Sequence, residues 1–334
     1  MTRIGKKSMP ILSQVKKLTK TEEAILATLS FFGILDIPLT EEKIWQNLYK
    51  IPASKETVRQ DLNRLIERNI VYVAETFRFP QNGGLKTSAT YFSLKPIDEI
   101  KLLANQAEIE KRWERINKYN WLLSLVPFIE QLSVINSLAL GNATAESDID
   151  FFVVTKPRRL YFVRTLIILI FRTFGIYKTK NKIKDQFCFG FYVTIDGLDL
   201  SGALIPGEDP HFAFWFASFV PLFGKRQYER LVAKNRWIYD YCPNFLPSQK
   251  VLDYKLRSSW TVFAKRVLEF LLFIPASALE PIFRFIHIRH TFKLPENHWA
   301  TSTTIAERDI LKLHAVDPRK QIRERFFALL QSLR

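Results

Sequence analysis

Apolar residues recur at helical spacing soon after the N-terminus. They stand three or four positions apart from Ile25 to Phe32, the period expected of an α-helix that packs one face against a core. Thr19 and Glu22 precede this run at the spacing of a capping box, in which each side chain binds the backbone N–H of the other residue. The pattern predicts a first helix over about residues 20–33.

Two shorter helices and a β-hairpin are predicted next. Thr40 and Ser54 are each placed to cap a helix, and the second of these helices, SKETVRQDLNRLIERN, carries one apolar stripe. Two β-rich runs, IVYVAETFRF and LKTSATYFSL, flank PQNGG, where the glycines supply the positive φ of a tight turn. Three helices and a hairpin form the pattern of a winged helix-turn-helix module.

The polar face of the third helix decides what such a module does. If this face enters a major groove, the module contacts DNA or RNA. If it is only solvated surface, the module serves in dimerisation or protein docking, and both alternatives stay open. The side chains of this face are Lys55, Arg59, Gln60, Asn63 and Arg64.

A turn of small residues followed by an acidic and apolar run, SLALGNATAESDIDFFVVT, occupies residues 137–155. Residues two apart on a strand point the same way, so Asp148 and Asp150 are expected on one face. Two parallel carboxylates suit a hard cation such as Mg²⁺ or Mn²⁺, while the backbone N–H groups of the turn suit a triphosphate. The alternative is that Asp148 caps a turn and Asp150 faces water.

This segment resembles the nucleotide-binding motif of the DNA polymerase β-like nucleotidyltransferases, and most closely that of their small stand-alone members. The resemblance implies that the two aspartates hold Mg²⁺ and that the serine and nearby amides hold the phosphates of an NTP. Asn136 departs from the motif, because it stands where the family has glycine. The motif positions present here are Ser137, the Gly141-Asn142-Ala143 turn, and Ser147-Asp148-Ile149-Asp150.

The resemblance also implies a third carboxylate from a later strand, which takes the proton from the attacking hydroxyl. The strand expected in this place is DQFCFGFYVT, residues 185–194, and its interior contains no acid. Asp185 at its start is our candidate, with Asp196 and Asp199 beyond its end. The alternative is that Asp185 is a solvated residue at the end of the strand. If none of these acids serves, the domain binds a nucleotide without turning it over.

Composition favours a polyanionic partner. The chain has 334 residues, with 49 Lys and Arg against 33 Asp and Glu, for a net charge of +16. The stretch from Lys156 to Lys184 has nine basic residues and no acidic one. Its members Lys156, Arg158 and Arg159 are therefore candidates to neutralise a triphosphate or steer a nucleic acid, or else form ordinary surface.

Several other expectations follow from local features. Two cysteines without paired or metal-type spacing, and no signal peptide, favour the cytoplasm. The apolar segments Tyr161–Phe174 and Val267–Ile286 are interrupted by charges and prolines. We therefore expect them to form core helices rather than to contact a membrane, and we expect no stable membrane insertion. Near the C-terminus, His314, Asp317 and Arg319 either reach the active site or have structural roles.

The predicted fold class is α/β: a nucleotidyltransferase core with a mixed sheet, preceded by a winged helix and followed by helices. The predicted function is Mg²⁺-dependent transfer of a nucleoside monophosphate from NTP to a hydroxyl on nucleic acid, protein or a small molecule. The alternative is a winged-helix regulator with a degenerate, nucleotide-sensing domain. The predicted segments are a basic arm (1–18), a winged helix (19–95), a helical connector (96–130), the nucleotidyltransferase-like domain (131–245) and a helical region (246–334).

Overall fold

The chain divides into two compact units. A computed structural model describes residues 18–78, 87–248, 259–293, 303–313 and 317–332. The first unit contains the chain up to Ile97 together with the stretch from Glu324, and the second runs from Asp98 to Arg323. Most of the basic arm, the PQNGG turn and His314 lie outside the described residues.

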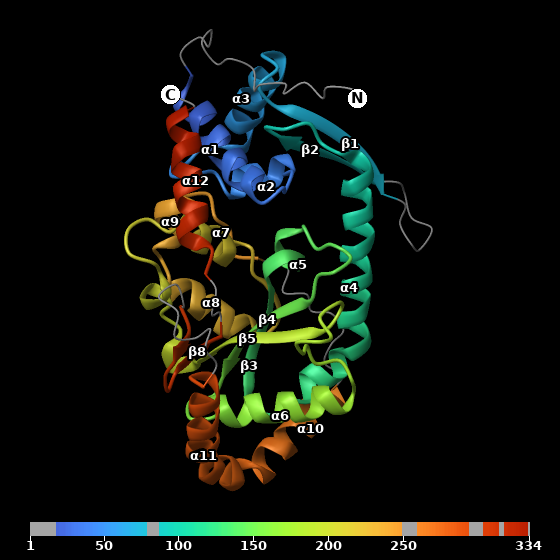
Figure 1. The fold of residues 1–334 in the computed structure, drawn as a ribbon, viewed down its shortest axis with the longest axis vertical. Coiled ribbons are helices and arrows are strands. Elements are labelled where there is room, and N and C mark those ends of the chain that lie inside the picture. Colours follow the sequence, from blue (N-terminus) through green and yellow to red (C-terminus); the bar gives the residue numbers. More distant parts are fainter. Residues whose placement is uncertain (1–17, 79–86, 249–258, 294–302, 314–316, 333–334) are drawn as a thin grey trace, which may run out of the picture. The chain divides into compact units, whose positions relative to one another are not determined.

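The first unit contains the three helices and the two strands that the pattern predicts (Figure 1). The capping box is confirmed, since Thr19 and Glu22 each accept the backbone N–H of the other. The strands pair antiparallel. Its elements are α1 (Lys20–Ile34), α2 (Glu41–Gln46), α3 (Lys55–Glu67), β1 (Tyr72–Arg78) and β2 (Thr87–Ser93).

The last helix of the chain completes the core of this unit. Phe326, on α12 (Arg319–Ser332), is fully buried. Its ring meets those of Phe31 and Tyr49 edge to face, with centroids 5.7 and 5.2 Å apart. The two ends of the sequence therefore share one apolar core.

The second unit is built on a six-stranded mixed sheet in the order β6-β3-β4-β5-β8-β7. Only β4 and β5 run parallel, and the other neighbours are antiparallel. All seven residues of β4 are buried, as expected for a central strand. The strands are β3 (Ile129–Ile135), β4 (Ile149–Thr155), β5 (Phe187–Thr194), β6 (Val220–Phe223), β7 (Ile305–Ala306) and β8 (Ile310–Lys312).

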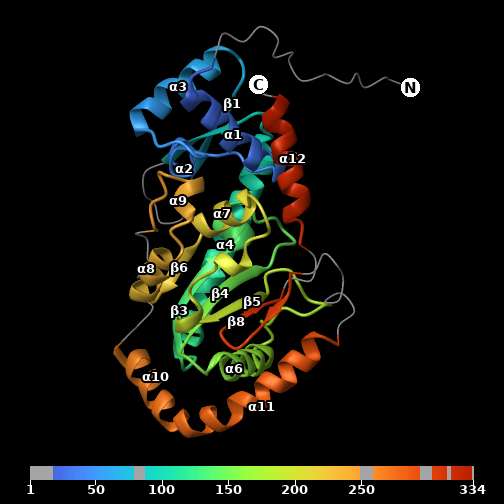
Figure 2. The same cartoon turned by 90° about the vertical axis from the view of Figure 1, so that its left-hand side faces the viewer.

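Helices cover both faces of this sheet (Figure 2). One face packs on α4 (Glu99–Leu125) and α6 (Leu160–Thr173), where Tyr161 and Phe171 are fully buried, so α6 is the core helix that the sequence predicts. The opposite face carries an aromatic layer from α7. The remaining elements on or near the sheet are α5 (Asn136–Leu140), α7 (Pro210–Ala217), α8 (Lys225–Lys234), α9 (Ile238–Tyr241) and the short 3₁₀ turns Ile195–Gly197 and Ser201–Ala203.

Two predictions about the C-terminal part of this unit are wrong. Residues 246–334 are not helical throughout, because β7 and β8 extend the sheet from β5. The segment Val267–Ile286 is not a core helix either. It lies on α10 (Ser259–Leu271) and α11 (Phe273–Thr291), where Phe270 and Ile274 are 82% and 77% exposed. Among the described helices, none has the length and sustained apolar character needed to cross a bilayer.

Candidate metal and nucleotide site

The two aspartates of the sequence motif lie together at the start of the buried strand β4. Asp148 directly precedes the strand, and Asp150 pairs in register with Cys188 on β5. One ligand atom from each of Asp148, Asp150 and Cys188 lies within 4.8 Å of the other two. The group joins two hard carboxylates to one soft thiol, and no pattern in the sequence pointed to Cys188.

Burial shapes the chemistry of this group. Burial, reinforced by the negative charge of Asp148, raises the pKa of Asp150 to about 6. Burial also raises the pKa of the Cys188 thiol, which keeps it protonated and able to donate to Asp150. A divalent cation would relieve the repulsion between the carboxylates, whereas a protonated thiol is a poor ligand for one.

Asn136 holds Asp150 in place. Its φ of +56° lies in the left-handed region, where glycine is favoured and asparagine is among the best-tolerated alternatives. Its side-chain amide bonds Asp150, and its Oδ1 accepts the indole N–H of Trp215 at 2.7 Å. Asparagine thus tolerates this left-handed backbone conformation and adds two polar contacts.

Lys178 is a second residue that the sequence did not single out. It follows α6, and its Nζ lies 2.6 Å from Asp148 Oδ2. Burial by itself lowers the pKa of Lys178. Nearby negative charge and the bond to Asp148 outweigh burial and raise this pKa. The ammonium group of Lys178 therefore already pairs with one of the two carboxylates.

Asp185 lies outside this group. Its carboxylate oxygens lie 2.8 Å from Lys111 and 3.1 Å from Arg112, and its backbone N–H donates to the carbonyl of Ser147. The fully buried Arg112 also donates to the Ser147 carbonyl, at 2.8 Å. These contacts make Asp185 part of a clamp on the turn before β4, and its catalytic role remains a prediction that this arrangement disfavours.

The predicted phosphate-binding turn is compact. The carbonyl of Ser137, on the short helix α5, accepts the N–H groups of Gly141 and Asn142 at 3.0 and 2.9 Å. Gly141 ends that helix with a φ of +85°, a conformation in which other residues are strained. Ser147 Oγ accepts the N–H of Thr144 at 2.9 Å, which closes the turn just before Asp148.

A cavity of about 220 Å³ adjoins the group through Asn136. Aromatic rings of β5 and α7 form one wall, with Phe191 and Trp215 stacked at a centroid distance of 5.6 Å. Lys312, Asp317 and Arg319 are also part of its lining. Asp317 and Arg319, two candidates from the C-terminal sequence, therefore share a cavity with Asn136.

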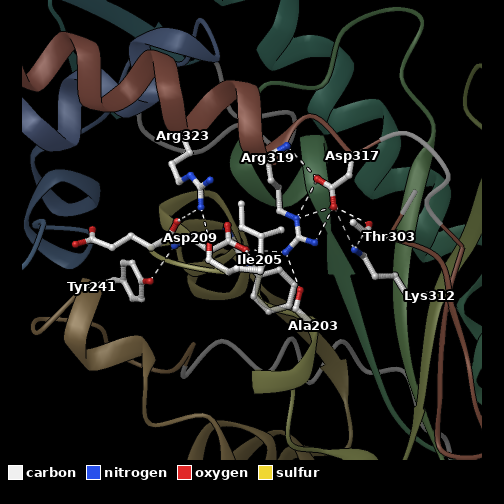
Figure 3. A network of polar contacts seen from close by, with 12 residues as sticks. Ala203, Ile205, Asp209, Tyr241, Thr303, Lys312, Asp317, Arg319 and Arg323 are labelled. Atoms are coloured by element: carbon white, nitrogen blue, oxygen red, sulfur yellow. Dashed lines mark hydrogen bonds and ion pairs between the residues drawn. The ribbon is translucent and has the colours of Figure 1, made fainter. Parts of the chain in front are cut away.

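Asp317 and Arg319 belong to a buried ionic network (Figure 3). Arg319 lies between Asp317 and Asp209, with a distance of 2.7 Å to each. Burial alone raises the pKa of Asp317, but the bonds from Arg319 and Thr303 outweigh it and the pKa is lowered. Burial and the charge of Arg319 lower the pKa of Lys312 to about 8.

The basic residues after β4 do not reach this site. Lys156 follows the opposite end of the strand, six positions from Asp150, which corresponds to about 20 Å. It pairs with Glu269 at 2.7 Å, and Arg159 is buried against Ser277 at 2.6 Å. These contacts disfavour one of the alternatives left open for this basic stretch, in which Lys156 and Arg159 neutralise a triphosphate at the aspartates.

The basic face of α3, in the first unit, is largely matched by acids. Arg59 grips the carboxylate of Glu41 with two nitrogens, at 2.8 and 3.0 Å from Oε1. Phosphate groups would have to compete with these carboxylates, so the basic face of α3 is a poor binding surface for nucleic acid. The ion pairs are Lys55 with Glu42, Arg59 with Glu41 and Arg64 with Asp61.

Comparison with protein-family models, with curated proteins and with solved structures finds no significant match to this chain.

Proposed function

We propose that the second unit is a Mg²⁺-dependent nucleotidyltransferase of the DNA polymerase β-like type, which transfers a nucleoside monophosphate from NTP to a hydroxyl acceptor and releases pyrophosphate. The observation that carries this proposal is the placement of Asp148 and Asp150. Both stand at the start of a buried central strand, directly after a compact turn of small residues. This is the arrangement that the resemblance predicts from sequence.

The carboxylates suit a divalent cation. Two aspartates together with substrate phosphates are a common ligand set for Mg²⁺. Burial and the charge of Asp148 raise the pKa of Asp150, and a divalent cation between the carboxylates would lower it again. When bound, Mg²⁺ or Mn²⁺ neutralises phosphate charge. Ser137, Gly141, Asn142 and the Ser147 turn would hold the phosphates, and Asn136 would keep Asp150 oriented.

The cavity beside Asn136 is the binding site that we assign to part of the nucleotide or to the acceptor. Its volume of about 220 Å³ is below the usual range for a whole drug-sized ligand, so it suits one part of a nucleotide such as the base. Phe191 and Trp215 give it an apolar wall, and Lys312 offers a charge-assisted donor. The same lining also suits an anionic small acceptor.

For the first unit we propose a winged-helix module that docks protein rather than nucleic acid. The three capped helices and the antiparallel hairpin support the module, and the ion pairs of α3 favour a docking role. A nucleic-acid acceptor for the second unit remains compatible with the net charge of +16.

Two observations favour a second candidate, a nucleotide sensor without turnover. The β5 position in register with Asp150 is Cys188 rather than a third carboxylate, and Lys178 already pairs with Asp148 at 2.6 Å. A protonated thiol cannot take the proton of an attacking hydroxyl at neutral pH. In this candidate the site binds NTP with a cation and reports its presence.

One experiment separates these candidates. The protein is incubated with each α-³²P-labelled NTP, with Mg²⁺ or Mn²⁺ and with total cellular RNA and protein, beside an Asp148→Asn/Asp150→Asn variant. Label on a macromolecule with the wild type alone supports the transferase. If NTP binds but no label is transferred to a macromolecule, the sensor is supported. This holds especially if Cys188→Asp gains transfer activity while Cys188→Ala does not. If neither binding nor transfer occurs, both candidates fail.

A further inference from the structure

Exposed apolar side chains are concentrated on α10 and α11. Twelve of the 21 exposed large apolar side chains in the described part of the chain lie between Trp260 and Phe292. Such a concentration differs from the scattered apolar residues of an ordinary surface and marks a contact surface. We call the following set the outer apolar face: Trp260, Phe263, Val267, Phe270, Ile274, Ile282, Phe285 and Ile286.

The spacing of these residues explains why they share one side. Trp260, Phe263, Val267 and Phe270 stand three or four positions apart on α10, so they form one stripe along the helix. The inner sides of the two helices are occupied, since α10 packs on α4 and α11 on α6 (Figure 2). The outer apolar face is therefore not covered by the described part of the chain, with Trp260 70% exposed and Phe270 82% exposed.

The acidic side chains of these two helices face inward, whereas several basic side chains are exposed. Glu269 accepts the N–H of Phe128 at 2.8 Å, and Glu280 accepts the N–H groups of Tyr161 and Phe162 at 3.1 and 2.7 Å. Both acids of the described stretch 259–293 thus face inward. Its exposed Lys and Arg side chains are Arg266, Arg289 and Lys293.

We propose that the outer apolar face docks on the surface of a membrane that contains anionic lipids. Helices that lie in a bilayer interface combine aromatic and aliphatic side chains on one face with basic residues at its margins, and these helices have that composition. Basic residues near the headgroups add attraction to anionic lipids. Docking of this kind needs no spanning helix, which agrees with the helices described.

An open cavity at the bend between the two helices fits a lipid headgroup. It has a volume of about 360 Å³ and is lined by Lys156, Arg159, Phe270 and Phe273, among others. Glu269 shares the lining but is neutralised by Lys156 at 2.7 Å. A lipid phosphate at the mouth of this cavity would lie near the positive charges of Lys156 and Arg159 while its acyl chains meet exposed aromatic rings.

Charge also argues against a second copy of the chain as the occupant. Two copies joined through this face would bring Arg266, Arg289 and Lys293 of each close to those of the other without a compensating acid from α10 or α11. An anionic bilayer supplies the missing negative charge.

The test is co-sedimentation of the full-length protein with vesicles. The vesicles contain phosphatidylcholine alone, or phosphatidylcholine with about a third phosphatidylglycerol. Phe270→Ser/Ile274→Ser removes two apolar anchors, and Ile100→Ser/Leu103→Ser on α4 is its control, because Ile100 is also 82% exposed. Arg289→Glu/Lys293→Glu reverses the charge, with Lys225→Glu/Arg226→Glu on the exposed part of α8 as its control.

We expect the wild type and both controls to bind the anionic vesicles, with at least about tenfold weaker binding by each of the two face variants. Brominated lipid should quench tryptophan fluorescence in the wild type and less so in Trp260→Phe. Three results overturn the proposal: no binding to anionic vesicles, equal loss in face and control variants, or a concentration-dependent dimer that Phe270→Ser/Ile274→Ser abolishes without any vesicle binding.

Discussion

At the scale of the residue, binding of a cation depends on the ionic balance around Asp148. Lys178 lies 2.6 Å from Asp148, so a divalent cation must displace an ammonium group that is already in place. Lys178→Met removes this competitor. We expect Mn²⁺ to bind at least several-fold more tightly, as measured by electron paramagnetic resonance at low ionic strength.

The same substitution affects stability without metal. The Lys178 side chain is 36% exposed, so its pair with Asp148 falls between a surface pair and a buried one, and we expect Lys178→Met to cost about 1 kcal/mol of unfolding free energy. Lys182→Met, in the same loop, is the control. Unchanged Mn²⁺ affinity in Lys178→Met would show that the cation does not bind at Asp148.

At the scale of the element, helix α6 depends on a cap from another helix. Arg159 at its N-terminus provides no side-chain cap, and Glu280 of α11 instead accepts the N–H groups of Tyr161 and Phe162. Glu280→Ala leaves both groups without this acceptor. We expect a loss of about 2 kcal/mol in chemical denaturation, with Glu280→Gln losing less. Glu146→Ala, at an 83% exposed side chain, should change stability little, and an equal loss there would contradict this role.

The packing of α11 on α6 also predicts a dependence on pH. Burial, with the charges of Arg164 and His290, lowers the pKa of His287 to about 4. Between this value and the ordinary one near 6.5 the unfolded chain binds more protons than the folded chain, so stability falls as pH falls through this window. His287 also bonds Thr165 and stacks on Tyr161.

His287→Gln isolates this contribution. We expect the wild type to lose stability relative to His287→Gln as pH is lowered from about 6.5 to about 4, in urea unfolding curves measured at each pH. Parallel pH profiles for the two proteins would mean that His287 is not held neutral by the fold.

The elements also show what sequence alone could predict. Helices α1 and α3 were predictable because Thr19 and Ser54 cap them locally and their apolar stripes are continuous. Strands β6 and β8 were not, because they are short and gain their identity only by pairing with β3 and β5. Such pairing depends on residues far away in sequence.

The residues of the candidate site also fall into those that sequence could predict and those that it could not. Asp148 and Asp150 lie within one local motif, so their neighbourhood was predictable. Cys188 joins them only through the parallel register of β4 and β5, and Lys178 only through the path of the loop after α6. The clamp of Lys111 and Arg112 on Asp185 required the docking of α4, which no local pattern encodes.

At the scale of the whole molecule, the positive charge does not identify a nucleic-acid surface. The net charge is +16, yet basic residues on α3 pair with acids. We expect labelled DNA and RNA duplexes to bind only in the non-specific range, about micromolar or weaker at physiological salt. Arg59→Ala should leave this binding unchanged in fluorescence anisotropy. Tight binding that Arg59→Ala abolishes would instead support groove recognition by α3.

The proposed function requires that Asp148 and Asp150 bind a nucleoside triphosphate together with a divalent cation. Equilibrium dialysis of each labelled NTP tests it most directly, with Mg²⁺ or with chelator, for the wild type and for Asp148→Asn/Asp150→Asn after both are shown to be folded by circular dichroism. We predict that at least one NTP binds only with Mg²⁺ and that the variant binds it at least about tenfold more weakly. Absence of binding by the folded wild type, or equal binding by the variant, would contradict the claim.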